Sequence, residues 1–178
     1  MKTFLALTIL FFSYSLTAAS SAGQNSLETL KMEKRFGIGV VAGGPLSIFG
    51  IEIDINISED FSLSGGIGTG IDYSTLALKG RYYLLGRSVS PYVGFGVARW
   101  WADSLKSADL APALVSNNFL GDGFKPEDGL NLFLLYPVLG VQYLHPMGIE
   151  FSAEVMYLFK LLNFANAAYA GVGVHWYF

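Results

Sequence analysis

Residues 50–58 read GIEIDINIS and carry the clearest pattern in the chain. Every second residue is an isoleucine, and the residues between them are acidic or amide side chains: Ile51, Ile53, Ile55 and Ile57 alternate with Glu52, Asp54 and Asn56. Successive side chains of a β-strand point to opposite faces, so a period of two predicts a strand with one apolar and one polar face. The pattern leaves open which of the two faces meets water.

The composition of the chain favours a membrane β-barrel. Only 14% of its 178 residues are charged and 52% are hydrophobic, whereas about 25% of an ordinary soluble domain is charged. Beyond the first 22 residues, no stretch stays apolar for the roughly 20 residues that a membrane helix needs. The net charge is -3 and no basic cluster carries interleaved aromatic residues, so nucleic acid is not an expected partner.

The N-terminal residues have the layout of a secretory signal peptide. A short basic start (1–3) precedes an apolar run (4–16) and a small, polar segment (17–22), so we expect export and cleavage after Ala19 or Ala22. The apolar run is short for a membrane anchor. Residues 23–34 are polar without a period of two and are interpreted as a linker or a short helix. The chain has no cysteine, so neither disulfides nor a lipidated cysteine is expected.

The remainder, residues 35–178, alternates strand and turn to its last residue, which predicts an all-β fold. The predicted strands are 35–43, 47–57, 61–72, 75–84, 91–101, 131–144, 149–160 and 166–178. Eight is an even number, as in bacterial single-chain outer-membrane barrels. With the N-terminus in the periplasm, the long connection 102–130 becomes an external loop. Pro137, in the sixth predicted strand, indicates a bulge or a strand break there.

Two closed-sheet folds fit the alternation: a soluble lipocalin-like barrel with its apolar face inward, and a membrane barrel with the polarity inverted. Glycines recur on the non-apolar face, and small residues suit the crowded interior of an eight-stranded barrel. The bulky apolar face would overfill that interior, and its aromatic residues gather near the strand ends, as in membrane barrels. We therefore place the isoleucines of GIEIDINIS in lipid and their polar neighbours in the lumen.

Two segments strengthen this interpretation, GVGVHWYF at 171–178 and SPYVGFGVA at 90–98. The first resembles the C-terminal signal that outer-membrane barrels present to the barrel-assembly machinery, with Val172, Val174, Trp176 and Phe178 as its alternate residues. The second resembles a strand common in small OmpA-like and OmpX-like barrels. The resemblance covers the chain from about residue 35. It implies an eight-stranded antiparallel up-and-down transmembrane β-barrel of a Gram-negative outer membrane, in contact with lipid and lipopolysaccharide. The peptidoglycan-binding domain that follows the barrel in OmpA is missing from this sequence.

Counting residues across the predicted turns places the lumenal charges. A three-residue turn at 58–60 sets Glu52 opposite Gly66, and a two-residue connection at 73–74 sets Gly66 opposite Arg81. Glu52 and Arg81 are then expected at one level. We hypothesise a lumenal ion-pair cluster of Glu52, Asp54, Lys79, Arg81, Glu150 and Glu154. Since a buried charge without a partner is costly, this cluster is interpreted as a plug that fixes the register rather than as a catalytic centre.

Other chemistry has little support in the sequence. The two histidines, His145 and His175, have no serine and acidic partner nearby in sequence, so no catalytic or metal site and no cofactor is predicted. GGIGTG at 65–70 lacks the ending of a nucleotide loop and lies inside a strand pattern. In the long loop, 104–115 is expected to form a short helix, and the acidic residues match no calcium loop.

We therefore predict a non-enzymatic outer-membrane barrel with a structural or surface-interaction role. Its lumen is plugged by polar side chains, and loop 102–130 is the contact surface for an extracellular ligand. A narrow pore for small solutes is the alternative, and a lipid-modifying enzyme is a weaker one.

Overall fold

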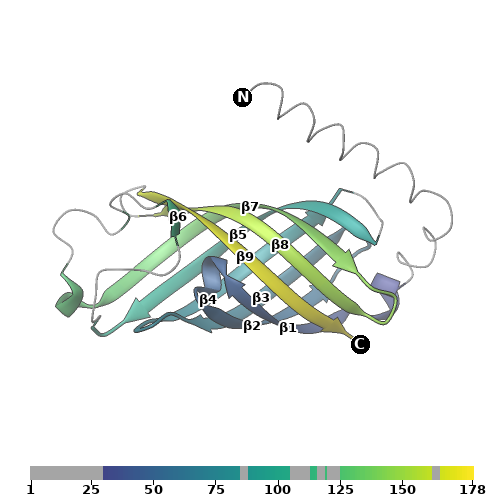
Figure 1. Cartoon of the computed structure of the whole chain (residues 1–178), viewed down its shortest axis with the longest axis horizontal. Helices are drawn as coiled ribbons and strands as arrows, with labels where there is room; N and C mark the ends of the chain where they lie inside the picture. The colour runs from purple at the N-terminus through teal and green to yellow at the C-terminus, as the bar shows by residue number, and fades with distance from the viewer. Residues whose placement is uncertain (1–29, 85–87, 105–112, 116–118, 120–124, 162–164) are drawn as a thin grey trace, which may run out of the picture.

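The computed structural model of the chain is a closed antiparallel β-barrel (Figure 1). The structure describes residues 30–84, 88–104, 113–115, 119, 125–161 and 165–178. The expected signal peptide, its cleavage site and most of the expected linker lie outside these residues. Among the residues described, no helix is long and apolar enough to cross a membrane.

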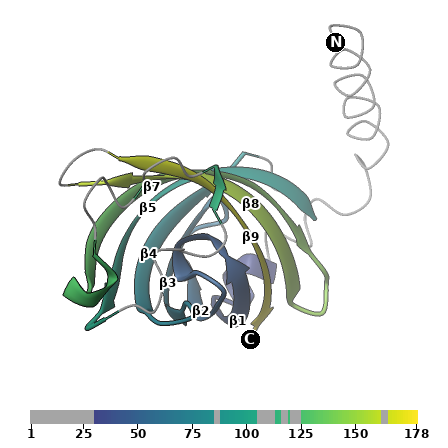
Figure 2. The same cartoon turned by 60° about the vertical axis from the view of Figure 1, so that its left-hand side comes forward.

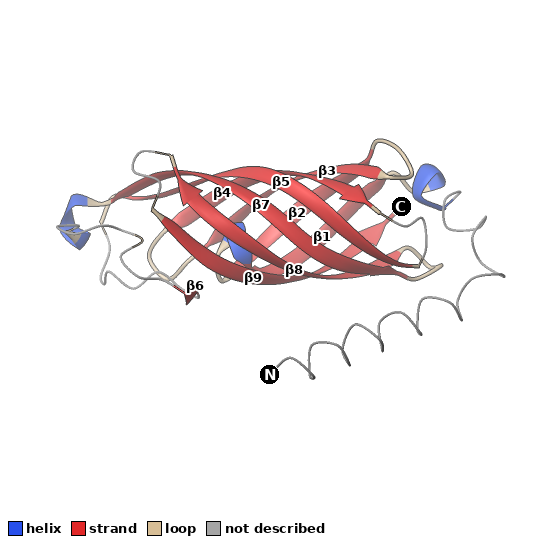
Figure 3. Cartoon of the chain, turned by 90° about the horizontal axis from the view of Figure 1, so that it is seen from above, coloured by secondary structure: helices blue, strands red, loops and turns tan. Residues whose placement is uncertain are grey.

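Eight long strands form the barrel wall within the described part of the chain. They are β1 (Phe36–Gly43), β2 (Phe49–Asn56), β3 (Phe61–Thr69), β4 (Ser74–Tyr83), β5 (Val89–Ala102), β7 (Leu130–Leu144), β8 (Ile149–Lys160) and β9 (Asn166–Tyr177). Each pairs with its neighbour in chain order, and β1 pairs with β9 to close the sheet (Figure 3). This confirms the eight-stranded, up-and-down all-β fold, with strand ends a few residues from those predicted.

A short strand in the long connection replaces part of an expected helix. β6 (Ala113–Val115) pairs with β9 at Ala168 and Tyr169, whereas the sequence predicted helix over 104–115. β1 ends opposite Gly171, so the edge of β9 beyond that point is not paired with β1. A strand edge that its neighbour leaves uncovered is a template for another strand. This explains why residues 113–115 form a strand against β9. Residues 105–112 lie outside the description.

The two faces of the wall differ as the membrane interpretation requires. Ile51 and Ile53 are 53% and 55% exposed, whereas Glu52 and Asp54 between them are 5% and 0% exposed. Large apolar side chains are exposed on all eight long strands. Soluble monomers rarely expose contiguous apolar patches larger than a few hundred Å². The polar face therefore lines the interior, and the lipocalin-like alternative is wrong.

The barrel has two distinct ends. We call the end where β1 begins and β9 finishes the terminal end, and the opposite one, which carries the long connection and the 3-10 helix η2 (Pro126–Asp128), the loop end (Figure 2). Two turns at the terminal end are described in full: 57–60 joins β2 to β3, and 145–148 joins β7 to β8.

Pro137 neither breaks its strand nor shifts the register. β7 is continuous, and its pairs with β8 keep the same register at Leu135 with Phe159 and at Val138 with Met156. The ladder to β8 is interrupted only between these pairs, while Pro137 stays opposite Phe95 of β5. The missing N–H of the proline therefore costs ladder bonds on one side alone.

Candidate functional site

The six predicted charged side chains all lie in the barrel interior. β2 contributes Glu52 and Asp54, β4 contributes Lys79 and Arg81, and β8 contributes Glu150 and Glu154. Within each pair the residues are two or four positions apart, which keeps them on one face of a strand. The first five are at most 5% exposed, and the side chain of Glu154 is 10% exposed.

Each cation in this layer bridges one carboxylate of β2 and one of β8. The Arg81 guanidinium lies 2.7 Å from Asp54 Oδ2 and 3.1 Å from Glu150 Oε1. The Lys79 Nζ lies 2.9 Å from both oxygens of Glu154 and 3.5 Å from Glu52 Oε1. Removing one partner of these buried pairs would leave the other charge without a partner. The layer therefore couples the three strands β2, β4 and β8 across the lumen.

The prediction that Arg81 lies at the level of Glu52 was wrong. Glu52 pairs with Gly66 as expected, but Gly66 pairs with Ala77, four residues before Arg81. The cause is the turn: β3 ends at Thr69, and Gly70 donates its N–H to the Tyr73 carbonyl at 2.8 Å, so four residues rather than two connect the strands. A shift of four preserves the faces but moves Arg81 toward the terminal end, beside Asp54 instead of Glu52.

Two tyrosine hydroxyls complete the layer, and the sequence analysis did not include them. The Tyr177 hydroxyl lies 3.0 Å from Asp54 Oδ2 and 3.0 Å from Glu150 Oε2, and it accepts from Arg81 Nη2 at 3.4 Å. The Tyr92 hydroxyl donates to Glu154 Oε2 at 2.7 Å. Both tyrosines alternate with the outward apolar residues of their strands. This alternation places them in the lumen and could have identified them from the sequence.

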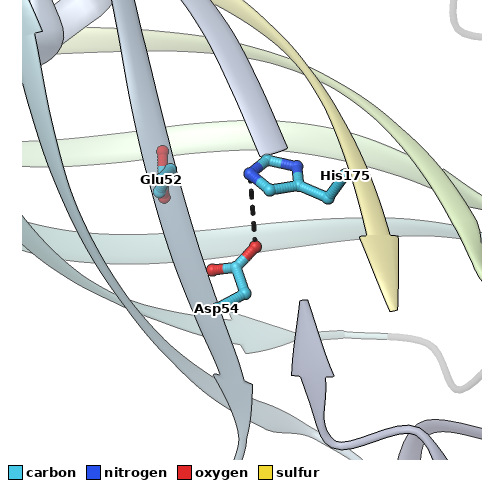
Figure 4. Close-up of side chains that lie close together, drawn as sticks. All are labelled: Glu52, Asp54 and His175. Atoms are coloured by element: carbon cyan, nitrogen blue, oxygen red, sulfur yellow. Dashed lines mark ion pairs between the residues drawn. The ribbon is translucent and has the colours of Figure 1, made fainter. Parts of the chain in front are cut away.

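His175 also reaches this layer. Its Nε2 lies 3.4 Å from Asp54 Oδ2 and its Nδ1 lies 3.8 Å from Glu150 Oε1 (Figure 4). The sequence placed His175 in the lumen but gave no partner, because the contact depends on β9 closing onto β1. His145 lies instead at the end of β7, where its Nδ1 accepts from the Met147 N–H at 3.2 Å.

The connection after β1 folds into the barrel instead of leaving it. The 3-10 helix η1 (Gly44–Leu46) lies within the outline of the strands (blue in Figure 3), and Leu46 is 1% exposed. Ser47 adopts a φ of 68°, which is uncommon for a residue other than glycine. Its hydroxyl shares a hydrogen bond of 2.5 Å with the Tyr73 hydroxyl. We call η1 together with Ser47 the inner plug.

Aromatic side chains surround the inner plug in the loop-end half of the lumen. Trp100 is 0% exposed and donates its indole N–H to the Pro45 carbonyl at 2.7 Å. Its ring centroid lies 5.3 Å from that of Tyr73 and 5.8 Å from that of Tyr169. Bulky residues were predicted on the lipid face, so this cluster was not expected, although Trp100 has the opposite phase to its neighbour Trp101.

A helical turn at residues 30–33 covers the terminal end. Leu30 packs against Leu144 and Tyr177, and Lys31 is 7% exposed with its Nζ 3.2 Å from the centroid of the Tyr83 ring. Burial lowers the pKa of the Lys31 ammonium to about 8. This part of the segment expected as linker or short helix is therefore a helical turn docked on the barrel.

Little space remains between these layers. A cavity of about 10 Å³ lies between the ion-pair layer and the inner plug, where Glu52, Glu154 and His175 are among its lining residues. That volume corresponds to about one water molecule. In the part of the chain that the structure describes, the lumen is thus filled by side chains at three successive levels.

Comparison with known proteins identifies the fold. No protein-family model and no curated protein matches the chain. The N-terminal β-barrel domain of Pseudomonas aeruginosa OprF is similar to it, with a TM-score of 0.60 and 15% identity over 82% of this chain and 98% of that domain. Neisserial surface protein A gives a TM-score of 0.46 at 12% identity over 81% and 95% of the two chains. The outer membrane enzyme PagL gives 0.39 at 14% identity over 79% and 97%.

At these identities the likeness concerns the fold alone, and among these three matches only that to the OprF domain exceeds a TM-score of 0.5. That domain is a β-barrel as well, and the likeness spans 98% of it. The chain therefore has the fold of the eight-stranded outer-membrane β-barrels.

Proposed function

We propose that this eight-stranded barrel is an outer-membrane protein with a structural or surface-interaction role and a plugged lumen. The observation that carries the proposal is the filling of the described lumen by the helical turn at 30–33, the ion-pair layer and the inner plug. The cavity between the ion-pair layer and the inner plug, about 10 Å³ in volume, is too small to pass a solute. Interiors of eight-stranded barrels are just wide enough to be filled by side chains. The outer surface and the loops are then the parts available for function.

The proposal assigns an orientation to the barrel. The exposed apolar side chains of the wall face lipid, the terminal end faces the periplasm, and connection 102–130 faces the outside as the contact surface for an extracellular ligand. Loops on a rigid scaffold commonly carry recognition. Residues 1–22 direct export as a cleaved signal peptide, and residues 23–34 lead into the barrel.

An epitope-insertion experiment tests the orientation. One variant carries the epitope after Asp103, at the loop end, and the matched variant carries it after Glu59, in the exposed turn at the terminal end. Antibody should label the first in intact cells and the second only after the outer membrane is permeabilised. The reverse pattern would overturn the orientation. A mobility shift on boiling shows that each variant has a closed barrel.

Arg99 supports contact with lipopolysaccharide. It is exposed on the outer face near the loop end, and its guanidinium carbon lies 5.7 Å from the Trp101 ring centroid and 5.3 Å from that of Phe133. Its Nε donates to Asn131 Oδ1 at 3.1 Å. A cation flanked by aromatic rings is typical of the membrane interface, where arginine pairs with lipid phosphate. Co-purification of lipopolysaccharide should fall in R99Q and persist in N131A.

The C-terminal residues support recognition by the barrel-assembly machinery. Val172, Val174, Trp176 and Phe178 are 48–66% exposed in a row on the outer face of β9. Removing Phe178 should lower the amount of barrel in the outer membrane while leaving refolding in detergent intact. F36A is the matched control, because Phe36 is an outward aromatic residue at the same end. Equal loss in both variants would contradict a specific signal.

Conductance and lipid analysis distinguish the alternatives. The purified barrel in planar bilayers should give no discrete current steps, and salt-dependent steps would favour a narrow pore. Incubation with lipid A should release no acyl chain, and release would favour a lipid-modifying enzyme. The lumenal position of His175, away from the lipid face, makes the enzyme the weaker alternative.

A further inference from the structure

Three possible metal ligands converge in the lumen from the two ends of the chain. Gly39 of β1 pairs with Glu52 on one side and with His175 on the other, so these three residues share one level of the wall. A Cβ on Gly39 would lie only 2.1 Å from the His175 ring, so the glycine leaves room for the imidazole to lean across β1. One ligand atom from each of Glu52, Asp54 and His175 lies within 4.8 Å of the others (Figure 4).

These side chains keep unsatisfied polar atoms although they are buried. Glu52, Asp54 and His175 are 5%, 0% and 2% exposed. Glu52 Oε1, Asp54 Oδ1 and both ring nitrogens of His175 make no hydrogen bond within the described chain. Buried polar atoms are nearly always hydrogen-bonded, and an ion or a water is a usual partner where no protein group serves. Figure 4 shows the imidazole directed toward the two carboxylates.

The charge of the layer also favours a bound cation. Four carboxylates, those of Glu52, Asp54, Glu150 and Glu154, face the cations Lys79 and Arg81 across the described lumen. Lys31, whose pKa is lowered to about 8, offsets at most one of the two remaining negative charges. At least one negative charge is then left for a bound cation.

The groups around the three ligands leave one atom of each free to face a metal. Arg81 and Tyr177 hold Asp54 through Oδ2, which leaves Oδ1 as the free ligand atom. Glu150 Oε1 faces His175 Nδ1 at 3.8 Å, so Nδ1 can donate to it while Nε2 binds the metal. A carboxylate behind a ligating histidine is the common way to fix its tautomer.

Lys79 does not prevent Glu52 from binding a metal. Its Nζ lies 2.9 Å from Glu154 and 3.5 Å from Glu52, so it keeps a close partner when Glu52 turns away. Ligand atoms around zinc lie about 3.3 Å apart, since the metal–ligand bonds are about 2.0–2.1 Å. The three side chains must therefore close inward. The adjoining cavity of about 10 Å³ offers room for a water as fourth ligand.

We propose that Glu52, Asp54 and His175 form a lumenal site for one divalent transition-metal ion, with Zn²⁺ as the ion that their nitrogen and oxygen donors suit. The metal links β2 to β9 across β1 and so pins the closure of the barrel. This role requires neither a pore nor an extracellular ligand, so it stands apart from the proposed function.

Zinc binding to the detergent-refolded chain tests the site. The chain is refolded either with a chelator, followed by Zn²⁺, or with Zn²⁺ present throughout, and bound zinc is measured after dialysis. We expect one zinc per chain in at least one protocol, and zinc bound only when present during refolding would mean that the closed lumen blocks entry. H175N and E52Q should each weaken binding at least tenfold. Their matched controls, H145N and E59Q, lie outside the lumenal layer and should change it less than twofold.

Two results would overturn the site: no stoichiometric zinc in either protocol, or binding by H175N equal to that of the wild type. Equal loss in E59Q and E52Q would also contradict it, because only Glu52 is assigned as a ligand. If a variant does not fold, the wild type decides the question, since the chain has only two histidines. In its NMR spectrum, Zn²⁺ should shift the ring signals of His175 and leave those of His145 unchanged.

Discussion

The Arg81 guanidinium lies 2.7 Å from the Asp54 carboxylate, and both side chains are at most 1% exposed. β3 lies between their strands and contributes the Ser62 hydroxyl, which accepts from Arg81 Nε at 3.2 Å. The guanidinium therefore spans β3 from within the lumen, joins β2 to β4 and continues to Glu150 of β8. This pair is therefore fully enclosed within the described lumen.

Replacing Asp54 by asparagine should destabilise the barrel strongly. D54N keeps the volume but removes the charge that Arg81 faces, and removing one partner of a buried ion pair costs about 3–5 kcal/mol. We expect the lower end of this range because Glu150 remains beside Arg81. The free energy of unfolding in urea, measured in lipid vesicles, checks this prediction. E59Q, in an exposed turn, should change it by less than about 0.5 kcal/mol. Equal values for the two variants would contradict a structural role of the pair.

The sequence was sufficient to predict where periodicity alone sets the structure. The alternation of GIEIDINIS assigned both faces of β2, because a period of two relates every side chain to its neighbours. The short turn at 58–60 placed Glu52 opposite Gly66, since a compact turn fixes the register. Such information is local, so it can be read from the chain itself.

What could not be predicted depends on contacts between distant segments. The turn after β3 is longer than expected because Tyr73 points into the lumen and meets Ser47 of the inner plug. The inner plug in turn depends on Trp100, which holds the Pro45 carbonyl. His175 meets Asp54 only because the last strand pairs with the first. None of these partners is near the other in sequence.

Gly39 should tolerate no side chain. A Cβ there would lie 2.1 Å from the His175 ring and 2.6 Å from the Val174 carbonyl oxygen, so G39A requires the backbone or the imidazole to move. We expect a loss of about 1–3 kcal/mol of unfolding free energy, as for other overpacked sites. G65A is the matched control, because its Cβ would meet Leu78 at an ordinary 3.6 Å. A glycine-to-alanine change without such a clash stabilises a strand by about 0.5–1 kcal/mol. Similar stabilities of G39A and G65A would show that the backbone or the imidazole moves at Gly39 with little loss of stability.

Adjacent tryptophans should report opposite environments. Trp100 is 0% exposed inside the lumen and Trp101 is 37% exposed on the outer face. W101F/W176F leaves Trp100, and W100F/W176F leaves Trp101 as the single tryptophan. In vesicles of brominated lipid, the fluorescence of Trp101 should be quenched and that of Trp100 should persist. Strong quenching of Trp100 would mean that its indole reaches lipid and does not hold the inner plug.

Removing the Trp100 indole should loosen the inner plug. W100A deletes the hydrogen bond to the Pro45 carbonyl and most of the aromatic contacts around η1. Large-to-small changes of buried tryptophan typically cost about 3–5 kcal/mol. We expect that loss of unfolding free energy together with small current steps in planar bilayers, which the wild type should lack. W101A removes an outward tryptophan and should produce no current. If W100A shows no current steps and keeps the stability of the wild type, the inner plug does not depend on the Trp100 indole.

Lys31 should make the stability of the barrel depend on pH above neutrality. Its pKa is lowered from 10.5 to about 8 by burial, so between these values the unfolded chain binds more protons than the folded one. The free energy of unfolding should therefore rise as pH increases from about 8 to 10.5, by up to about 3 kcal/mol from this group. Because other groups also titrate there, the readout is the difference between the wild type and K31Q. That difference should increase with pH, while K34Q controls for the loss of a positive charge at the same end. If the difference in unfolding free energy stays constant or falls with pH, Lys31 is not buried against the Tyr83 ring at the terminal end.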